Sequence, residues 1–292
     1  MLYLLTASLL WACSFGLIKH RLGGVDAAFV AWVRLTLSAL VFLPWLRLRG
    51  VSLPRAAALL GVGAVQYGLM YWAYVRSFGY LASHQVALLT IFTPLYVTLL
   101  ADALERRFRR RFLLAAALAV AGAGLALGRG ADWRIAGRGV WLVQISNVCF
   151  ALGQVAYRRL GAPVGQGADW RSEGREFGLL YLGAAAVTSL AAGANAARAA
   201  AGLATGQWLT LLYLGLAPSA LGFYLWNVGA RRVSSGTLAA MNNAKIPLAV
   251  VCSLLIFGER AAWAGLAGGG LALAAAVWLG ERGPERSNAK EG

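Results

Sequence analysis

Hydrophobic residues form long, uninterrupted runs along almost the whole chain, and short polar segments separate these runs. Each run is about 18–22 residues long, which is the length of helix that crosses a hydrocarbon core of about 30 Å. The runs lack the alternation over about ten residues that marks the strands of a membrane barrel. A helix satisfies its own backbone hydrogen bonds in lipid, so the runs are predicted to be helices. Ten membrane-spanning helices are expected, at residues 2–18, 28–46, 56–78, 82–101, 112–128, 138–157, 176–194, 207–229, 234–257 and 262–280.

The composition agrees with this pattern. Of the 292 residues, 60% are hydrophobic and 13% are charged, whereas a typical soluble domain has about 25% charged residues. The net charge is +16, but the basic residues lie at the ends of the apolar runs, as in membrane proteins, and this placement argues against nucleic-acid binding. An all-α integral membrane protein in a lipid bilayer is therefore predicted, with a polar tail at 281–292.

Lys and Arg are unevenly distributed between the two sets of connecting segments. If the N-terminus lies inside, the inside segments hold the larger share of these residues. The positive-inside rule then places both the N-terminus and the C-terminal tail in the cytoplasm. Together with a composition rich in Arg, Ala and Gly, this orientation predicts a bacterial inner (cytoplasmic) membrane.

The two halves of the chain share a sequence pattern. Tyr71 and Tyr224 are separated by 153 residues, and the same separation relates Pro94 to Pro247, each of which interrupts an apolar run. Five helices per half is an odd number, so the second half would enter the membrane upside down relative to the first. A duplicated pair of Pro-interrupted segments is typical of a secondary transporter that works by alternating access, here with the prolines as hinges. The two repeats are predicted at 2–128 and 138–280.

Several short motifs are similar to those of one transporter family. They are the segment Leu9–Gly16, the segment Trp32–Leu35 with its Arg34, and the pairs Pro94/Glu105 and Pro247/Glu259. With these motifs the chain resembles the drug/metabolite transporter superfamily, in the branch built from two EamA-type five-helix repeats. One departure is Leu104, which stands where the family usually has Gly. The resemblance implies a ten-helix bundle around a central cavity and transport of a small molecule, often by export.

Lys245 is a basic residue deep inside a predicted span. It lies about ten residues into the ninth helix, or about 15 Å from its end. It follows Asn242 and Asn243 and comes two residues before Pro247, which leaves the carbonyl of Asn243 without a helical donor. An ionisable group at this depth usually faces a partner or a water-filled cavity, so we expect a binding site for an anionic group. The alternative is a structural lysine that donates to the freed carbonyls.

Polar and aromatic side chains in the other spans are further candidates for the cavity wall. Uncharged polar residues also form hydrogen bonds between helices, and aromatic residues also pack or lie at the membrane interface, so each has a structural alternative. The candidates are Gln66, Tyr71, Gln144, Asn147, Tyr224, Trp226 and Asn227.

Three charged residues are given a structural or gating role. Arg34 lies about 9 Å into the second helix and is interpreted as a structural or interfacial arginine, with a charge able to extend to the interface and a functional role as the alternative. Glu105 and Glu259 precede the fifth and tenth predicted helices. Negative charge at a helix N-terminus is stabilising, and this is the preferred interpretation of both glutamates.

The charge pattern inside the predicted spans favours some functions over others. It places no carboxylate in mid-membrane, whereas Lys245 is a deep positive charge. A substrate with a carboxylate, such as an amino acid or organic acid, is therefore favoured, with export as the expected direction. Alternatives are amines, drugs or nucleotide-like metabolites, or a non-transporting scaffold or receptor. Enzymatic, metal and cofactor motifs are lacking in the sequence, so no enzyme activity, metal or cofactor is expected. Gly265, Gly268, Gly269 and Gly270 of the last span offer a surface for a homodimer.

Overall fold

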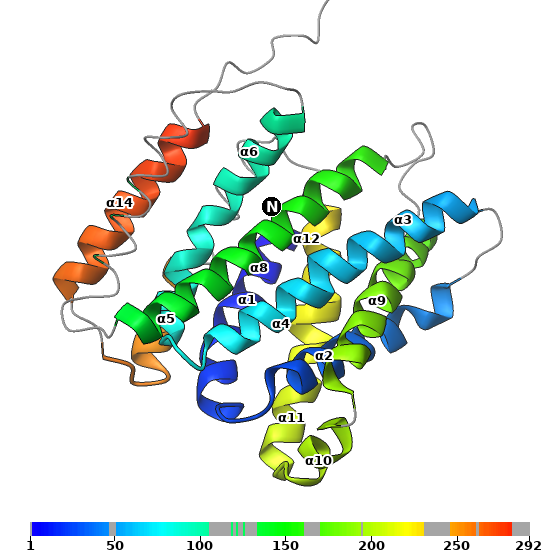
Figure 1. Ribbon diagram of the computed structural model, residues 1–292, viewed down its shortest axis with the longest axis horizontal. Coiled ribbons are helices and arrows are strands. Elements are labelled where there is room, and N and C mark those ends of the chain that lie inside the picture. The colour runs from blue at the N-terminus through cyan, green and yellow to red at the C-terminus, as the bar shows by residue number, and fades with distance from the viewer. Residues whose placement is uncertain are drawn as a thin grey trace, which may run out of the picture.

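The computed structural model describes residues 2–46, 51–104, 118, 121, 125, 133–160, 170–193, 195–230, 246–260 and 263–281. Its regular elements within these ranges are helical (Figure 1). In chain order they are α1 (Leu2–Arg21), α2 (Ala27–Phe42), the 3₁₀ turn η1 (Leu43–Trp45), α3 (Leu53–Gly63), the π-helical segment η2 (Ala64–Leu69), α4 (Met70–Ser77), α5 (Ser83–Leu89), the 3₁₀ turn η3 (Thr90–Phe92), α6 (Thr93–Leu104), α8 (Trp133–Leu160), α9 (Trp170–Ala192), α10 (Asn195–Ala201), α11 (Thr205–Leu214), the π-helical segment η4 (Gly215–Leu221), α12 (Gly222–Ala230), the helix Ile246–Leu255 and α14 (Trp263–Glu281).

These helices follow the apolar runs of the sequence. Five described segments are long and apolar enough to cross a membrane: α1, α2 with η1, α3–η2–α4, the greater part of α8, and α11–η4–α12. The short helix α10 follows α9 and belongs to no predicted span. The predicted span 112–128 lies almost entirely outside the described residues, as does the first half of the span 234–257. The described residues therefore form helices, five of which have the length and composition to span a membrane, while ten spans and inverted repeats stay predictions.

The helices pack side by side in one bundle (Figure 1). α1 lies against α12, α2 lies between α9 and η4, and α8 contacts both α4 and α6, with α14 packed on α6. α3 and α9 approach most closely, because Gly63 on α3 faces the carbonyl of Leu180 and Gly183 on α9 faces the carbonyl of Leu60. A methyl group at either glycine would collide with the facing backbone, so the two glycines set the separation of these helices.

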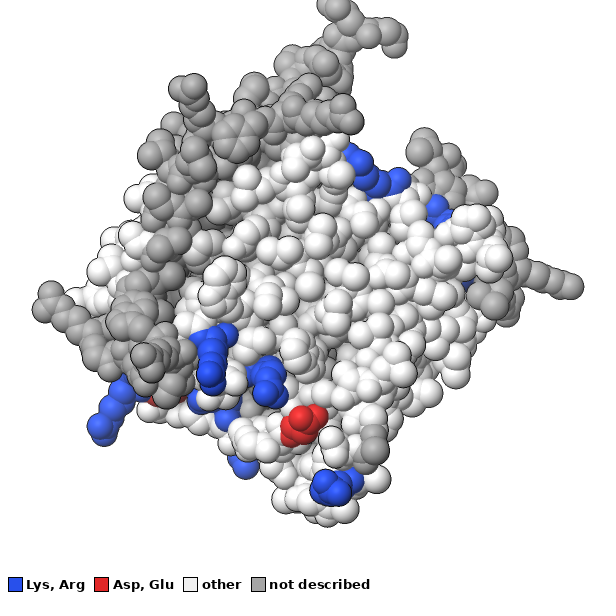
Figure 2. Space-filling model, viewed as in Figure 1, with Lys and Arg blue, Asp and Glu red and all other residues white. Residues whose placement is uncertain are grey.

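On the surface of the described residues, the charged side chains gather near the ends of the helices. On the face drawn in Figure 2, Lys, Arg and Asp or Glu appear along two opposite edges, and the broad described surface between them carries no charge. Large apolar side chains such as Trp141 on α8 and Leu212 on α11 are exposed on the outside of the bundle. An uncharged belt between two charged edges is the surface that a bilayer requires.

Two of the long apolar segments contain a π-helical segment: η2 lies between α3 and α4, and η4 lies between α11 and α12. The separation of 153 residues that relates Tyr71 to Tyr224 carries 64–69 onto 217–222, so the two segments occupy matching places in the sequence. Segments of this kind are rare and occur mostly at functional sites. Here each one directly precedes a helix that contributes side chains to the central cavity.

Candidate substrate-binding cavity

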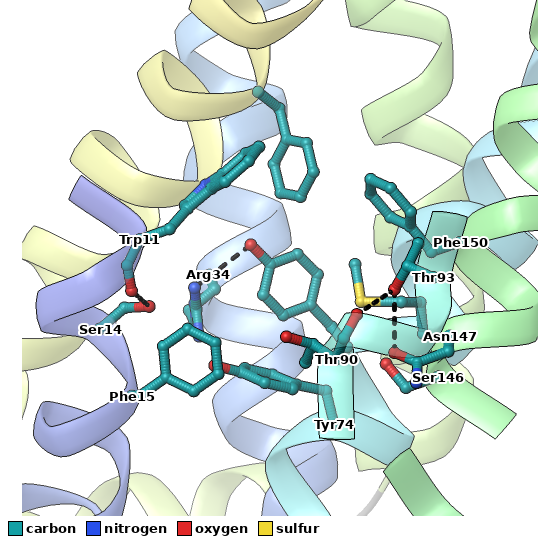
Figure 3. Close-up of a pocket in the computed structure, with 13 residues that line it drawn as sticks. Trp11, Ser14, Phe15, Arg34, Tyr74, Thr90, Thr93, Ser146, Asn147 and Phe150 are labelled. Atoms are coloured by element: carbon teal, nitrogen blue, oxygen red, sulfur yellow. Dashed lines mark hydrogen bonds between the residues drawn. The ribbon is translucent and has the colours of Figure 1, made fainter. Parts of the chain in front are cut away.

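A cavity lies in the middle of the bundle, where α1, α2, α4, η3, α6, α8 and α12 meet (Figure 3). Its empty volume is about 570 Å³, the open solvent at its mouth included. The lining residues are Trp11, Ser14, Phe15, Arg34, Met70, Tyr71, Tyr74, Thr90, Thr93, Ser146, Asn147, Phe150 and Phe223.

Arg34 brings a positive charge to the cavity wall. Its side chain is buried, and only 1% of the residue is exposed. Nε donates to Oγ of Ser219 at 3.2 Å, and Nη2 donates to Oη of Tyr71 at 3.3 Å. The guanidinium carbon also lies 4.4 Å from the centre of the Tyr71 ring, a cation–π contact. The expected extension of Arg34 to the interface is therefore wrong, because α4 and η4 cover the side chain and supply its partners.

The residues around Arg34 form a connected polar group. The hydroxyl of Ser219 donates to Oη of Tyr71 at 3.2 Å, and Tyr181 donates to the backbone carbonyl of Ser219 at 2.6 Å. Ser38 lies one turn after Arg34. Its hydroxyl donates to the carbonyl of Arg34 at 3.0 Å and to the carbonyl of Gly215 at 3.1 Å. These bonds join α2, α4, α9 and η4, so the position of the guanidinium is set by four elements.

A second polar group lies across the cavity and is uncharged (Figure 3). Nδ2 of Asn147 on α8 donates to the carbonyl of Leu89 at 2.9 Å and to Oε1 of Gln144 at 3.2 Å. The hydroxyl of Thr93 lies 3.1 Å from Oδ1 of Asn147, to which it donates. Tyr96 donates to Oε1 of Gln144 at 3.0 Å. This arrangement holds the Asn147 amide in one orientation at the wall, with Gln144 behind it.

Aromatic rings form the wall between these two groups. Trp11 packs on Phe223 with ring centres 4.8 Å apart, and Phe15 meets Tyr74 edge to face at 5.6 Å. The indole nitrogen of Trp11 donates to the carbonyl of Pro218 in η4 at 2.8 Å, which fixes the ring against the second half of the bundle. The rings provide apolar surface, and the hydrogen bond of Trp11 keeps that ring in place.

Two of the residues that the sequence placed at the cavity line it, namely Tyr71 and Asn147. Gln144 is one layer behind the wall. Tyr224 and Trp226 are outside the lining: Tyr224 packs on Phe177 with ring centres 5.8 Å apart, and Trp226 packs behind Trp11 at 5.1 Å. These two rings support the cavity wall from the side of α12.

The remaining described amide candidates also lie away from the cavity lining. Asn227 donates to the carbonyl of Phe223 at 2.9 Å, within its own helix. Gln66 is buried, and its side chain lies against Gly153 of α8, where a β-carbon would overlap it. Lys245, Asn242, Asn243 and Glu105 lie outside the described residues.

The sequence analysis missed most of the small polar groups in the cavity wall. Ser14, Thr90, Thr93 and Ser146 line the cavity, but serine and threonine are common inside membrane helices, where they donate to the preceding turn. Ser14 does so in this protein, with a bond of 2.7 Å to the carbonyl of Trp11. Trp11 and Phe15 carried a usable signal, since residues four apart in a helix share a face.

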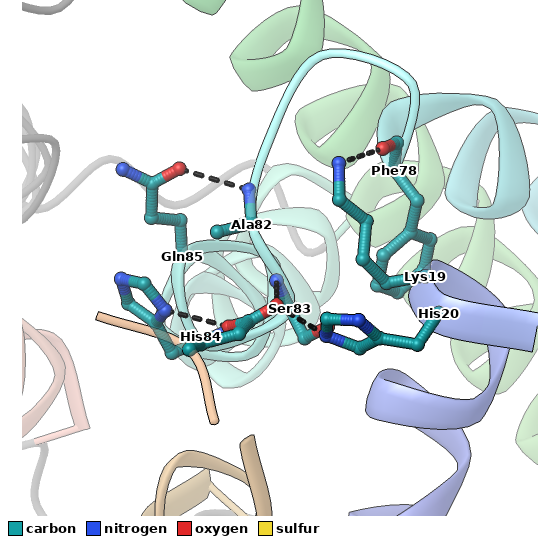
Figure 4. Close-up of polar contacts among 8 residues, drawn as sticks. Lys19, His20, Phe78, Ala82, Ser83, His84 and Gln85 are labelled. Carbon is teal, nitrogen blue, oxygen red and sulfur yellow. Dashed lines mark hydrogen bonds and ion pairs between the residues drawn. The ribbon is translucent and has the colours of Figure 1, made fainter. Parts of the chain in front are cut away.

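Glu259 lies in the loop before α14, and Figure 4 shows its partners His20, Ser83 and His84. Its carboxylate accepts hydrogen bonds from the backbone N–H of Ser83 at 2.9 Å and of His84 at 3.2 Å. It also pairs with Nδ1 of His84 at 2.8 Å and with Nε2 of His20 at 3.2 Å. Glu259 was expected to face the N-terminus of the tenth helix. It lies instead at the N-terminus of α5, because the loop brings it beside Ser83.

The pKa of the Glu259 carboxyl reflects this position. Burial alone raises the pKa, but the bonds from the His84 side chain and from Ser83, together with the backbone N–H of His84, outweigh burial and lower it to about 2. The carboxylate is therefore ionised at every physiological pH and joins the loop to α1 and α5.

The arrangement of helices around a central cavity agrees with known proteins. The family model of EamA-like transporters matches residues 1–128 and 137–280. The chain therefore belongs to the EamA-like transporter family. It is an integral membrane transporter, and it is not an enzyme.

Relatives of known name cover nearly the whole chain. The chain is 37% identical over 284 residues to the biotin transporter of Salmonella typhimurium and to that of Escherichia coli. Each of these alignments covers 96% of this chain and 92% of the relative. It is 38% identical over 286 residues to the probable biotin transporter of Pseudomonas aeruginosa, with 97% and 98% covered. A protein of known crystal structure superposes with a TM-score of 0.62 at 21% identity, over 96% of each chain. That likeness supports the fold alone.

Proposed function

We propose that the chain transports biotin across a bacterial cytoplasmic membrane. The observation that carries the proposal is 37–38% identity, over at least 96% of the chain, to proteins named for biotin transport. This replaces the amino acid or general organic carboxylate that the sequence alone favoured, because the relatives are named for one vitamin. The proposal includes cytoplasmic termini and a homodimer contact through the small residues of α14.

The cavity offers the contacts that a molecule like biotin requires. Biotin has two small fused rings, one of which contains a urea group, and an aliphatic chain that ends in a carboxylate. The rings of Trp11, Phe15 and Phe223 supply apolar surface for the fused rings and the chain. Arg34 and Asn147 supply polar contacts at separate places on the wall. A mostly apolar pocket with a few placed polar groups is the usual form of a small-molecule site.

Alternating access is the proposed mechanism, with Pro94 and Pro247 as hinges. Pro94 is the second residue of α6, directly after the 3₁₀ turn η3, and Pro247 lies in the helix described as Ile246–Leu255, whose preceding residues are outside the described part of the chain. Proline is tolerated in the first turn of a helix because its missing N–H is not needed there. The chain can therefore change direction at Pro94 without breaking a helical bond. Lys245, Asn242 and Asn243, next to Pro247 in the sequence, stay proposed contributors to the site.

Uptake of tritiated biotin tests the proposed substrate. A biotin-requiring bacterial strain without a biotin transporter of its own would express the chain, with an empty plasmid as the control. We expect accumulation of label that excess unlabelled biotin suppresses and that amino acids leave unchanged. Loss of label from preloaded cells measures export, the direction that the sequence favoured. No uptake or loss above the control, with the protein present in the membrane, would contradict the proposal.

A further inference from the structure

We propose that Arg34 binds the carboxylate of the transported molecule, while Asn147 and the hydroxyl groups beside it bind the uncharged ring end. The inference rests on the proposed function, since it takes biotin as the ligand. It adds to that function an orientation of the ligand in the cavity and a rule of selectivity, which is preference for the ionised acid over neutral derivatives.

The guanidinium of Arg34 is a buried cation whose hydrogen-bonding capacity is only partly used. Nε and Nη2 donate to Ser219 and Tyr71, but Nη1 has no partner among the described residues. Within the described part of the chain, no Asp or Glu lines the cavity or forms an ion pair with Arg34. A charge inside the membrane region is costly unless it is paired. The planar fork of a guanidinium matches the two oxygens of a carboxylate, so an anionic ligand would complete this site.

The opposite wall suits a different end of the ligand. Asn147, Ser146, Thr93 and Thr90 are gathered across the cavity from Arg34, with aromatic rings between the two groups (Figure 3). Both N–H groups of Asn147 donate to Leu89 and Gln144, so its Oδ1 and the hydroxyl oxygens are the acceptors, and a hydroxyl that turns toward the ligand is the donor. The urea group of biotin has N–H donors and a carbonyl acceptor, so both of its functions find partners there. The apolar chain would then lie along the rings.

A purely structural Arg34 is the competing explanation. It would act as a link between α2, α4 and η4 through Ser219 and Tyr71. The two explanations differ in one measurable property. A link that only holds helices together affects acidic and neutral ligands equally, whereas a carboxylate-binding residue changes the preference between them.

Competition on the unmodified protein is the first test. Tritiated biotin bound to the purified transporter would be displaced by biotin, by desthiobiotin, which keeps the carboxylate, and by the neutral alcohol and methyl ester of biotin. We expect the neutral compounds to compete about 10–100-fold more weakly than the two acids, which is the usual strength of hydrogen bonds to a charged group. Equal competition would overturn the inference and leave biotin transport intact. Absence of biotin binding would overturn the proposed function and this inference with it.

Variants then locate the preference. Arg34→Gln is expected to lose about 10–100-fold in affinity for biotin and little for the alcohol, so the ratio of the two approaches one. Arg34→Lys keeps the charge and should retain part of the preference, while Arg34→Met removes the charge and decides the question if Arg34→Gln fails to fold. Arg55→Gln is the matched control, because it removes the same charge from a pair with Glu176 outside the cavity lining. A folded uncharged Arg34 variant, Gln or Met, that prefers the acids as strongly as the control does would exclude Arg34 as the binding residue.

Discussion

Replacing Glu259 by Gln is expected to lower the stability of the detergent-purified protein by about 1–2 kcal/mol at pH 7. The carboxylate accepts two backbone bonds at the start of α5, from Ser83 and His84, and pairs with the side chains of His84 and His20. Gln has nearly the same shape but only one acceptor oxygen, and its NH₂ group would face donors. Contacts made by one of the two carboxylate oxygens are therefore lost.

The pKa of the carboxyl sets the size of this effect. Burial raises the pKa and the hydrogen bonds from His84 and Ser83 lower it, with the net result that it falls from 4.5 to about 2. At about 1.4 kcal/mol per pKa unit, this fall is worth at most about 3.5 kcal/mol. The side chain of His20 is 37% exposed, and solvent around the cluster weakens the electrostatic part. We therefore expect about 1–2 kcal/mol, or about 2–8 °C in Tm.

The pH dependence gives the prediction its sign. A carboxyl whose pKa is lower in the folded state adds stability that is fully present above pH 4.5 and is lost as the pH falls toward 2. Thermal unfolding of the protein and of Glu259→Gln would be followed at pH 7 and at pH 3. The difference in Tm should be largest at pH 7 and clearly smaller at pH 3.

The His20→Gln variant is the control, because it removes only the outermost partner and should cost less than about 1 kcal/mol. The reasoning would be refuted by a Tm of Glu259→Gln equal to that of the unmodified protein at pH 7. It would also be refuted by a difference that stays the same at pH 3, since the stabilisation would then not come from the ionised carboxylate.

Two further substitutions test the packing and the remaining candidate charge. Gly183→Ala is expected to lower the stability of the protein in thermal unfolding by about 1–3 kcal/mol, because its new methyl group meets the carbonyl of Leu60. The control Gly61→Ala places its methyl group in open space, so the stability should stay the same or rise by up to about 1 kcal/mol. Lys245→Met is expected to abolish transport and leave membrane insertion and folding intact, and normal transport rates in the variant would show that Lys245 does not bind substrate.

The order and extent of the helices could be predicted from hydropathy alone, because lipid forces each spanning segment to be apolar and helical. What hydropathy cannot predict is a departure from regular helix that keeps the apolar run intact. The segments η2 and η4 are of this kind, since both lie within long apolar runs, and only Pro218 in η4 gives a local signal of the departure. The helix α10 was missed because it is only seven residues long and too short to span a membrane.

The cavity could be predicted only where a residue is unusual in lipid. Tyr71 and Asn147 stood out for that reason, and both line the wall. The depth of Arg34 in its helix was known from the sequence, but depth does not tell whether a side chain faces lipid, the interface or the interior. Its partner Ser219 lies 185 residues further along the chain. The position of Glu259 depends likewise on a contact with Ser83 that spans 176 residues, and a contact of that range leaves no local pattern.

The duplicated sequence pattern and the cavity make different demands on the chain. Alternating access requires two halves of similar shape, and the matching places of η2 and η4 agree with that requirement. Biotin, however, has one charged end and one neutral end, so its site has to be unequal. Arg34 and Lys245 are the basic residues that the predicted spans place inside the bilayer, and the residues 153 positions away from them are Val187 and Phe92. Each cation thus belongs to one half only. We therefore expect the fold to provide the two states of access and these unmatched charges to set the orientation of the substrate. Substitutions of Arg34 and Lys245 should then alter selectivity, whereas Gly183→Ala should alter stability.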